Sequence, residues 1–419
     1  MPWQMSRQLG GLWRHSEFMK LWTGQTISQV GSQVTLLALP FTAVLVLHAT
    51  PRQMGLLYAA QTAPFLVVGL FAGVWVDRLR RRPILIGGDL GRAVLLGWLP
   101  IGALLGLLRI EQLYVVAVLV GFCTLLFDVA YQSFLPVLVG REHLVEGNSK
   151  LEVSRSAAQI VGPGLGGLLV QLITAPVAIV VDALSFLVSG LVLILIRTPE
   201  PRQAIVRRGM RVEMAEGLSI VLGSPLLRSI AGCTGTSNLF GSALQAVLVL
   251  YATRDLDLPP ALLGLALGAG SVGALLAAML SGRIVRRIGV GASIVGGISL
   301  GIPACALIAL AAGPPNVAAA VLTVAQALLG FGGVLYNVNQ VSLRQAITPD
   351  RLLGRMNATM RFIIWGTMPI GALLGGSLGE AIGLRGTLVA VAAGALVTPL
   401  WVLLSPVRRL REQPTPATT

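Results

Sequence analysis

The sequence predicts an all-α polytopic membrane protein with twelve transmembrane helices in two six-helix bundles. Three observations lead to this fold class. The chain is 55% hydrophobic and only 11% charged, whereas soluble domains carry about 25% charged residues. Apolar runs recur at lengths close to the roughly 20 residues that a helix needs to cross a bilayer. The basic residues gather in alternate connections, which is the positive-inside pattern of membrane proteins.

The apolar runs, taken in chain order, give six helices before a long polar connection and six after it. Short polar connections separate the runs and set their limits. We expect the first six helices at 20–48, 54–77, 83–108, 112–139, 149–173 and 176–197. We expect the second six at 225–252, 260–283, 289–312, 316–342, 353–383 and 386–405.

The one long hydrophilic connection divides the chain into two halves. We therefore predict a first bundle over 1–196, a cytoplasmic central loop over 197–224, a second bundle over 225–405 and a cytoplasmic tail over 406–419. Within the loop, residues 210–221 have the pattern of a short amphipathic helix that lies on the membrane surface.

The net charge of +14 raises the question of an anionic partner. If the N-terminus is cytoplasmic, the opposite loops hold only Arg52, Arg109, Arg254 and Arg385. This distribution indicates that the positive charge orients the helices, with both termini in the cytoplasm of a multi-pass cell-membrane protein. Nucleic acid is not an expected partner, although a smaller patch for an anionic ligand remains an alternative.

Enzyme chemistry has no support in the sequence. A Walker loop needs a Gly-Lys pair, and the two lysines, Lys20 and Lys150, follow Met19 and Ser149. The three cysteines lie in apolar runs, without metal-ligand spacing. We therefore expect that the protein is not an enzyme and that it binds no metal or cofactor. We expect a proton gradient to be its energy source.

The two halves repeat each other. Residues 43–50 and 246–253 agree at seven of eight positions, each at the end of the first helix of its half. Gly55 and Gly264 each precede, by 18 residues, a glycine that opens a basic loop. A parallel repeat of this kind is how many membrane transporters are built.

The basic loop of the first half resembles the signature loop of the major facilitator superfamily, and the resemblance covers essentially residues 14 to 405. Its residues are Gly73, Asp77, Arg78, Arg81 and Arg82, with Arg80 where a glycine is usual. The resemblance implies a conformational latch between the halves. The alternative is that the arginines only orient the helix pair. The second-half copy has Arg286 in place of Asp77 and should latch less well.

A second motif, on the fifth helix, is similar to one associated with drug:proton antiporters. It consists of Gly162, Pro163, Gly166 and Gly167, and it predicts a kink or a close helix contact. A direct role in export is implied by resemblance only. Phrases at 21–29, 127–136 and 182–186 resemble the branch that holds an enterobactin exporter and macrolide efflux proteins.

Ionisable residues inside apolar runs are candidates for proton coupling, because a charge at bilayer depth costs roughly 2.5–3.5 kcal/mol. We select Asp128, Arg155 and Asp182. Asp128 would alternate between a proton and Arg155, the alternative being a permanent ion pair. Asp89 and Arg92 share one helical face and are expected to pair structurally.

Polar stripes on equivalent helices of both halves are candidates for the wall of a substrate cavity. Uncharged amides and hydroxyls suit a neutral or amphiphilic ligand, and they also bind helices together. The candidates are Gln25, Gln29, Gln33, Tyr131, Gln132, Asn238, Ser242, Gln245, Asn337, Arg361 and Trp365.

Together these patterns predict a secondary transporter that exports amphiphilic, drug-like or macrolide-like small molecules against protons by alternating access. A siderophore exporter, an uncoupled uptake carrier and a non-transporting membrane scaffold or sensor are the alternatives. The expected partners are the small-molecule substrate, protons and the lipid bilayer, with a monomer favoured.

Overall fold

The computed structural model describes residues 11–67, 69, 79–197 and 210–412. Within these ranges every regular element is a helix. In the first half α1 continues into a π-helical turn, η2 (Thr42–Val46), so that one span covers Ser16–Val46. The helices of this half are α1 (Ser16–Phe41), α2 (Pro51–Val67), α4 (Arg81–Leu104), α5 (Ile110–Val139), α6 (Leu144–Ile173) and α7 (Ala175–Ile194).

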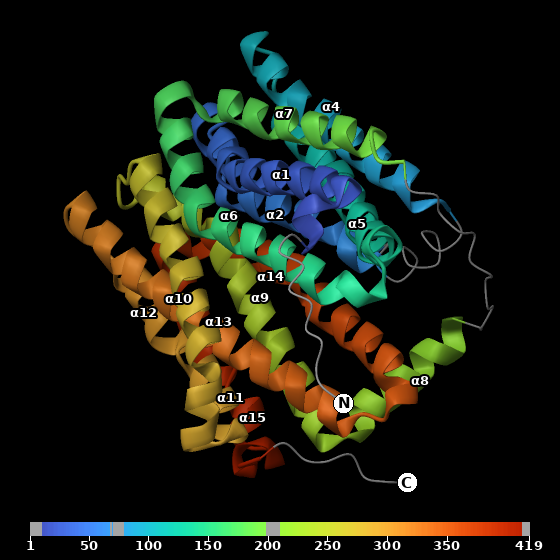
Figure 1. Ribbon diagram of the computed structural model, residues 1–419. Coiled ribbons are helices and arrows are strands. Elements are labelled where there is room, and N and C mark those ends of the chain that lie inside the picture. The colour runs from blue at the N-terminus through green and yellow to red at the C-terminus, as the bar shows by residue number, and fades with distance from the viewer. Residues whose placement is uncertain (1–10, 68, 70–78, 198–209, 413–419) are drawn as a thin grey trace.

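The second half has the same order of helices (Figure 1). Two short helices make one span over Val290–Leu310, and α14 is broken at Gly383, whose φ of 79° is left-handed. The helices are α9 (Pro225–Arg254), α10 (Pro260–Ile288), α11 (Val290–Ser299), α12 (Gly301–Leu310), α13 (Pro315–Ile347), α14 (Asp350–Val397) and α15 (Leu400–Leu403).

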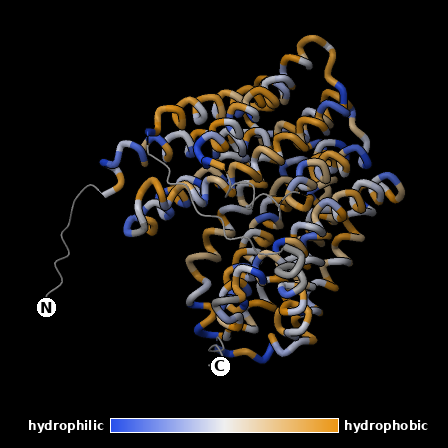
Figure 2. The backbone as a smooth tube through the Cα atoms, turned by 90° about the vertical axis from the view of Figure 1, so that its right-hand side faces the viewer, coloured by the Kyte–Doolittle hydropathy of each residue, from blue (hydrophilic) through white to orange (hydrophobic). Residues whose placement is uncertain are grey.

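The predicted fold class is confirmed. Ten helices or helix pairs of the described residues are long and apolar enough to cross a membrane. Two more complete the twelve, because α2 has 17 described residues and α14 contains two helices joined at Gly383. Hydrophobic residues recur along the helices throughout the molecule (Figure 2).

Several helices begin earlier than the apolar runs predict. The first starts at Ser16 rather than at residue 20, since the His15 side chain accepts a hydrogen bond from the Phe18 backbone and caps the helix. The fifth starts at Leu144 rather than at residue 149. The first turns of both helices contain polar residues, so hydropathy does not mark where the helices begin.

The central connection contains α8 (Met210–Gly223), at the place where an amphipathic helix is predicted. Its Glu216 forms an ion pair with Arg355 of α14. This contact attaches α8 to the second half.

The two halves are joined at one side of the bundle and separate at the other. We call the side where α1 begins and α15 ends the terminal side. One hydrophobic core at the opposite side contains residues of both halves, among them Leu57 and Leu248. At the terminal side each half has its own core, around Phe134 in the first half and Met356 in the second.

Glycines bring the halves into backbone contact at the opposite side. A Cβ on Gly55 of α2 would lie 2.8 Å from the Cα of Gly376 on α14, and one on Gly167 of α6 would clash with the Pro260 carbonyl of α10. Arg254 also donates a 3.0 Å hydrogen bond to the Ala49 carbonyl across the halves. The structure is therefore closed at the opposite side.

Candidate functional site

A cavity of about 1290 Å³ lies between the halves and is lined by residues of both. Its walls include Asn148 and Glu152 near the start of α6, and Gln345 and Asn357 near the junction of α13 and α14. These residues lie at the terminal side, where the cores are separate. The cavity thus belongs to a state that is open toward the terminal side and sealed at the opposite side.

The glutamine stripe of α1 forms part of the first-half wall. Gln25, Gln29 and Gln33 all line the cavity, as the four-residue spacing predicts. Tyr131 and Gln132 of α5 line it as well. These five predicted wall residues are brought together by the structure.

Asp182 on α7 lies behind the stripe, with only 1% of its surface exposed. Its Oδ1 accepts hydrogen bonds from Ser185 at 3.1 Å and from Ser32 of α1 at 3.5 Å. The position of this carboxyl requires a glycine at residue 31, because a Cβ on Gly31 would lie 2.7 Å from the same oxygen. Asp182 is a buried acid held by hydroxyl groups at the edge of the cavity.

Arg92 on α4 is the cation at the centre of the first half. It is 6% exposed, and its Nη2 lies 2.5 Å from Oδ1 of Asp89, so the predicted pair is confirmed. The guanidinium stacks between the rings of Phe127 and Phe186, at 4.5 and 4.0 Å from their centroids.

Arg92 also lines the cavity, and its charge acts on Asp128 and Asp182. Arg92 therefore lies within electrostatic reach of acids on three helices, although among the described residues it forms an ion pair only with Asp89.

The direct ion pair expected between Asp128 and Arg155 is not formed among the described residues. Arg155 lies instead 3.9 Å from Glu152, one turn earlier on α6. Asp128 is exposed in the cavity wall and feels the charges of Arg92, Arg155 and Arg361 without contacting one of them. Asp128 on α5 and Arg155 on α6 both line the cavity. In this open state the cavity separates the two side chains.

The second-half wall contains Arg361 and Trp365 of α14, as predicted. The Arg361 guanidinium lies 5.5 Å from the Trp365 ring centroid. The Trp365 ring in turn makes an edge contact at 5.1 Å with Phe65 of α2 in the other half. This wall offers a cation and an aromatic surface.

Four predicted cavity residues do not line this cavity, and their assignment to its wall is corrected for this state. Asn238 donates to the Ile364 carbonyl of α14 at 3.0 Å and so joins two helices. Ser242 is buried next to the tight contact between Ala243 and Gly375. The four are Asn238, Ser242, Gln245 and Asn337.

Most of the predicted latch, namely Gly73, Asp77 and Arg78, lies outside the described residues. Arg81 and Arg82 begin α4. Arg82 donates to the carbonyls of Leu193 and Ile194, at 3.2 and 2.6 Å, and so joins α4 to the end of α7.

The helix-5 motif makes the predicted close contacts. A Cβ on Gly166 would lie 3.1 Å from the Val34 backbone of α1, and one on Gly162 would clash with Gln33. Gly167 and Pro163 face α10 instead, through Pro260 and Gly264. The motif packs one helix against both a neighbour in its own half and the other half.

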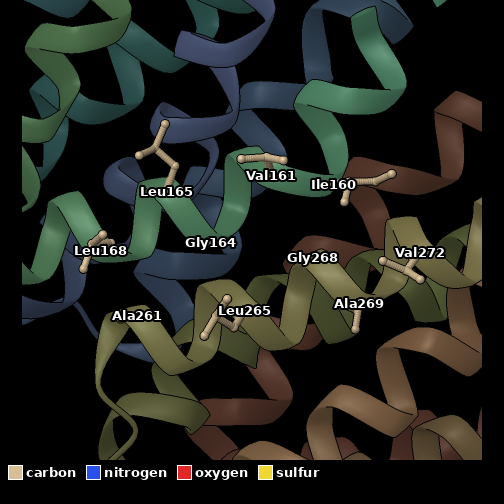
Figure 3. Close-up of a pocket in the computed structure, with 10 residues that line it drawn as sticks. All are labelled: Ile160, Val161, Gly164, Leu165, Leu168, Ala261, Leu265, Gly268, Ala269 and Val272. Carbon is tan, nitrogen blue, oxygen red and sulfur yellow. The ribbon is translucent and has the colours of Figure 1, made fainter. Parts of the chain in front are cut away.

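A second hollow of about 670 Å³ lies between α6 and α10 (Figure 3). All its lining residues are apolar or glycine, for example Leu168, Leu265 and Gly268. With no polar group to orient a ligand, it is a weaker site candidate than the central cavity.

Sequence reasoning missed several cavity residues, among them Arg344, whose place near a predicted helix end made it look like a loop charge. It is 7% exposed and lines the cavity. Its helical spacing of four from Gln340 was the only available signal, since burial at a helix end depends on tertiary packing.

Comparison with known proteins agrees with this architecture. A family model described as Major Facilitator Superfamily matches residues 21–363 and 230–419. The multidrug efflux pump Tap of Mycolicibacterium fortuitum is 29% identical over 91% of this chain and 93% of its own length. The enterobactin exporter EntS of Salmonella typhi is 27% identical over 96% of this chain and 95% of its own length.

Solved structures show the same fold. A bacterial homologue of the iron transporter ferroportin in an inward-facing state has a TM-score of 0.75 at 20% identity, over 93% of this chain and 98% of that one. The nucleoside transporter NupG has a TM-score of 0.74 at 11% identity, over 93% of this chain and 98% of that one.

Proposed function

The chain belongs to the major facilitator superfamily, and from that premise we propose that it is a proton-coupled exporter of amphiphilic small molecules. The two halves rock about the central cavity, which faces each side of the membrane in turn. The protein works as a monomer in the cytoplasmic membrane, with the terminal side in the cytoplasm.

The observation that carries this proposal is the cavity itself. It lies between the repeated halves, is sealed at one side by glycine contacts and combines apolar, aromatic and polar walls. Such a mixture suits a ligand with one apolar and one polar part.

Proton coupling rests on the acids of the first half. Asp128 is exposed in the cavity and has no direct partner among the described residues, while Asp182 is buried among hydroxyl groups. Both share the charge of Arg92. A carboxyl whose cationic partner changes with conformation binds a proton in one state and releases it in the other. We propose Asp128 as the first candidate for the acid that carries the proton, and Asp182 as the second candidate.

The siderophore exporter is the second candidate, because EntS is named an enterobactin exporter and aligns over nearly its whole length. Export in general is favoured by the names of the two relatives, a multidrug efflux pump and an enterobactin exporter. An uncoupled uptake carrier keeps the same fold, and the test below separates it from the exporter. A scaffold or sensor has no need of a large polar cavity.

The test is transport in reconstituted vesicles under an imposed pH gradient. Drugs and siderophores are screened for movement, with wild type and with Asp128→Asn and Asp182→Asn. We expect gradient-driven accumulation in wild type and its loss in Asp128→Asn, with downhill exchange of the substrate retained. Glu111→Gln, which removes an exposed carboxyl of α5 that does not line the cavity, is the matched control and should accumulate substrate like wild type.

Two results would count against the proposal. Equal gradient-driven accumulation by wild type and both aspartate variants would remove these acids from coupling. Movement that never responds to the gradient, in a demonstrably folded protein, would favour the uncoupled carrier, and no movement of any compound would favour the scaffold.

A further inference from the structure

We propose that the second-half wall of the cavity is an anion subsite, in which Arg344 binds the acidic group of an aromatic substrate. This inference rests on the proposed transport function and narrows its substrate class from amphiphiles in general to organic anions with an aromatic ring.

Arg344 carries the inference because two of its three nitrogen atoms are buried in the cavity wall without an acceptor among the described residues. The side chain is 7% exposed and lines the cavity. Its Nε and Nη1 are buried, and among the described residues neither has a hydrogen-bond partner. A guanidinium stays charged in proteins, and buried charges are normally paired. These nitrogens lie behind the surface of the cavity wall and lack the acceptor that a ligand in the cavity would supply.

A purely structural role explains the position of Arg344 but not its free donors. It lies in the last turn of α13, where the helix dipole favours a cation. Gln340, one turn earlier, does not satisfy it, because the Gln340 Oε1 also lacks a partner among the described residues while its Nε2 donates to Asn337. The planar fork of arginine suits a carboxylate, sulfonate or phosphate, each of which accepts two parallel hydrogen bonds.

The charges of the cavity are divided between the halves. Among the described lining residues of the second half the only charged ones are Arg344 and Arg361. The acids of the wall, Asp128, Glu152 and Asp182, all come from the first half, and the two arginines of that half already lie beside carboxylates. An anionic group is therefore attracted most strongly to the second-half wall, and this arrangement fixes the orientation of the ligand.

The aromatic part of the ligand has a surface on the same wall. Trp365 and Phe362 line the cavity, and Phe362 is 44% exposed. Trp365 already makes an edge contact with Phe65, which leaves aromatic edges and faces for a further ring. Arg361, next to Trp365, adds a second cation for the acidic group.

The experiment compares two fluorescent probes that share the dansyl ring system and differ in the headgroup, the anionic dansyl sulfonate and the neutral dansyl amide. Binding to the purified full-length protein is measured by equilibrium titration, without a pH gradient, for wild type, Arg344→Gln and Arg344→Lys. Arg287→Gln is the matched control, since Arg287 also lies in the last turn of a helix but is exposed and does not line the cavity.

We expect wild type to bind the sulfonate more tightly than the amide, and Arg344→Gln to weaken sulfonate binding by about tenfold or more, the loss expected for one hydrogen bond to a charged group. Amide binding should stay unchanged in that variant, which also shows that the cavity is folded. Arg344→Lys should retain part of the preference, and Arg287→Gln all of it.

Equal affinities for the two probes in wild type would overturn the inference. So would a loss of sulfonate binding of the same size in Arg287→Gln, or an equal loss of both probes in an Arg344→Gln protein that still unfolds at the wild-type temperature. Because binding is measured at equilibrium, these outcomes are independent of gradient-driven transport, which tests the proposed function.

Discussion

At the scale of single residues, the first half depends on one buried arginine. Arg92 is held by Asp89 at 2.5 Å and by two aromatic rings, and its charge reaches Asp128 and Asp182. Two buried opposite charges offset much of each other's desolvation cost only while both are present. Arg92 is therefore needed both for the stability of the half and for the charge balance of the cavity.

We predict that Arg92→Gln lowers stability by about 3–5 kcal/mol, because it leaves Asp89 buried without its cation. Thermal unfolding in detergent measures the effect. The double variant Arg92→Gln/Asp89→Asn should recover most of the loss, since it removes both charges. If the double variant is no more stable than Arg92→Gln alone, the ion pair is not the reason for the stabilising effect of Arg92.

The sequence predicts the Asp89–Arg92 pair because a spacing of three residues on a helix brings side chains together. It predicts the α1 stripe for the same reason, and Gln25, Gln29 and Gln33 do line one wall. Contacts between helices follow different rules. The rings of Phe127 and Phe186 around Arg92, and the separation of Asp128 from Arg155, depend on tertiary packing that no local spacing encodes.

At the scale of helices, repeated glycines define where the halves meet. Gly55 and Gly264 open equivalent helices, and each lies against a helix of the other half, through Gly376 and Pro163. The repeat is visible in the sequence, and close approach is a general use of glycine in membrane helices. Helix ends are less predictable, because polar residues such as Ser16 extend helices past their apolar runs.

The predicted latch belongs to this scale, although Asp77 lies outside the described residues. If Asp77 stabilises the state that is closed at the terminal side, Asp77→Asn should favour the open state of this structure. We expect a shift of about 1 kcal/mol, an about fivefold change in population, as for a carboxylate at a helix N-terminus.

Labelling of a cavity cysteine, Gln29→Cys, by an impermeant maleimide from the terminal side measures this shift in a background without the three native cysteines. Asp77→Asn should speed labelling, while Arg286→Gln at the equivalent place of the second half should change it much less. Equal changes in the two variants would show that the latch is not specific to the first half.

At the scale of the whole molecule, alternating access requires that closing one side of the cavity opens the other. Helix α6 of the first half packs against α10 of the second half. Distances between these two helices therefore show whether the halves are close together at each side. Val145 and Ile288 are exposed at their terminal ends, and Leu172 and Leu265 are exposed toward the opposite side. The hydrophobic core shared at the opposite side must part when the separate terminal cores approach each other.

The most direct measurement is of spin-label distances in lipid nanodiscs for two pairs, Val145→Cys with Ile288→Cys and Leu172→Cys with Leu265→Cys, each in the cysteine-free background. The change Gly55→Leu, placed on the other helix pair, disrupts the contact with Gly376 and destabilises closure of the opposite side. We predict that it shortens the terminal pair while it lengthens the opposite pair. A lengthened opposite pair with an unchanged terminal pair would contradict alternating access by rocking halves.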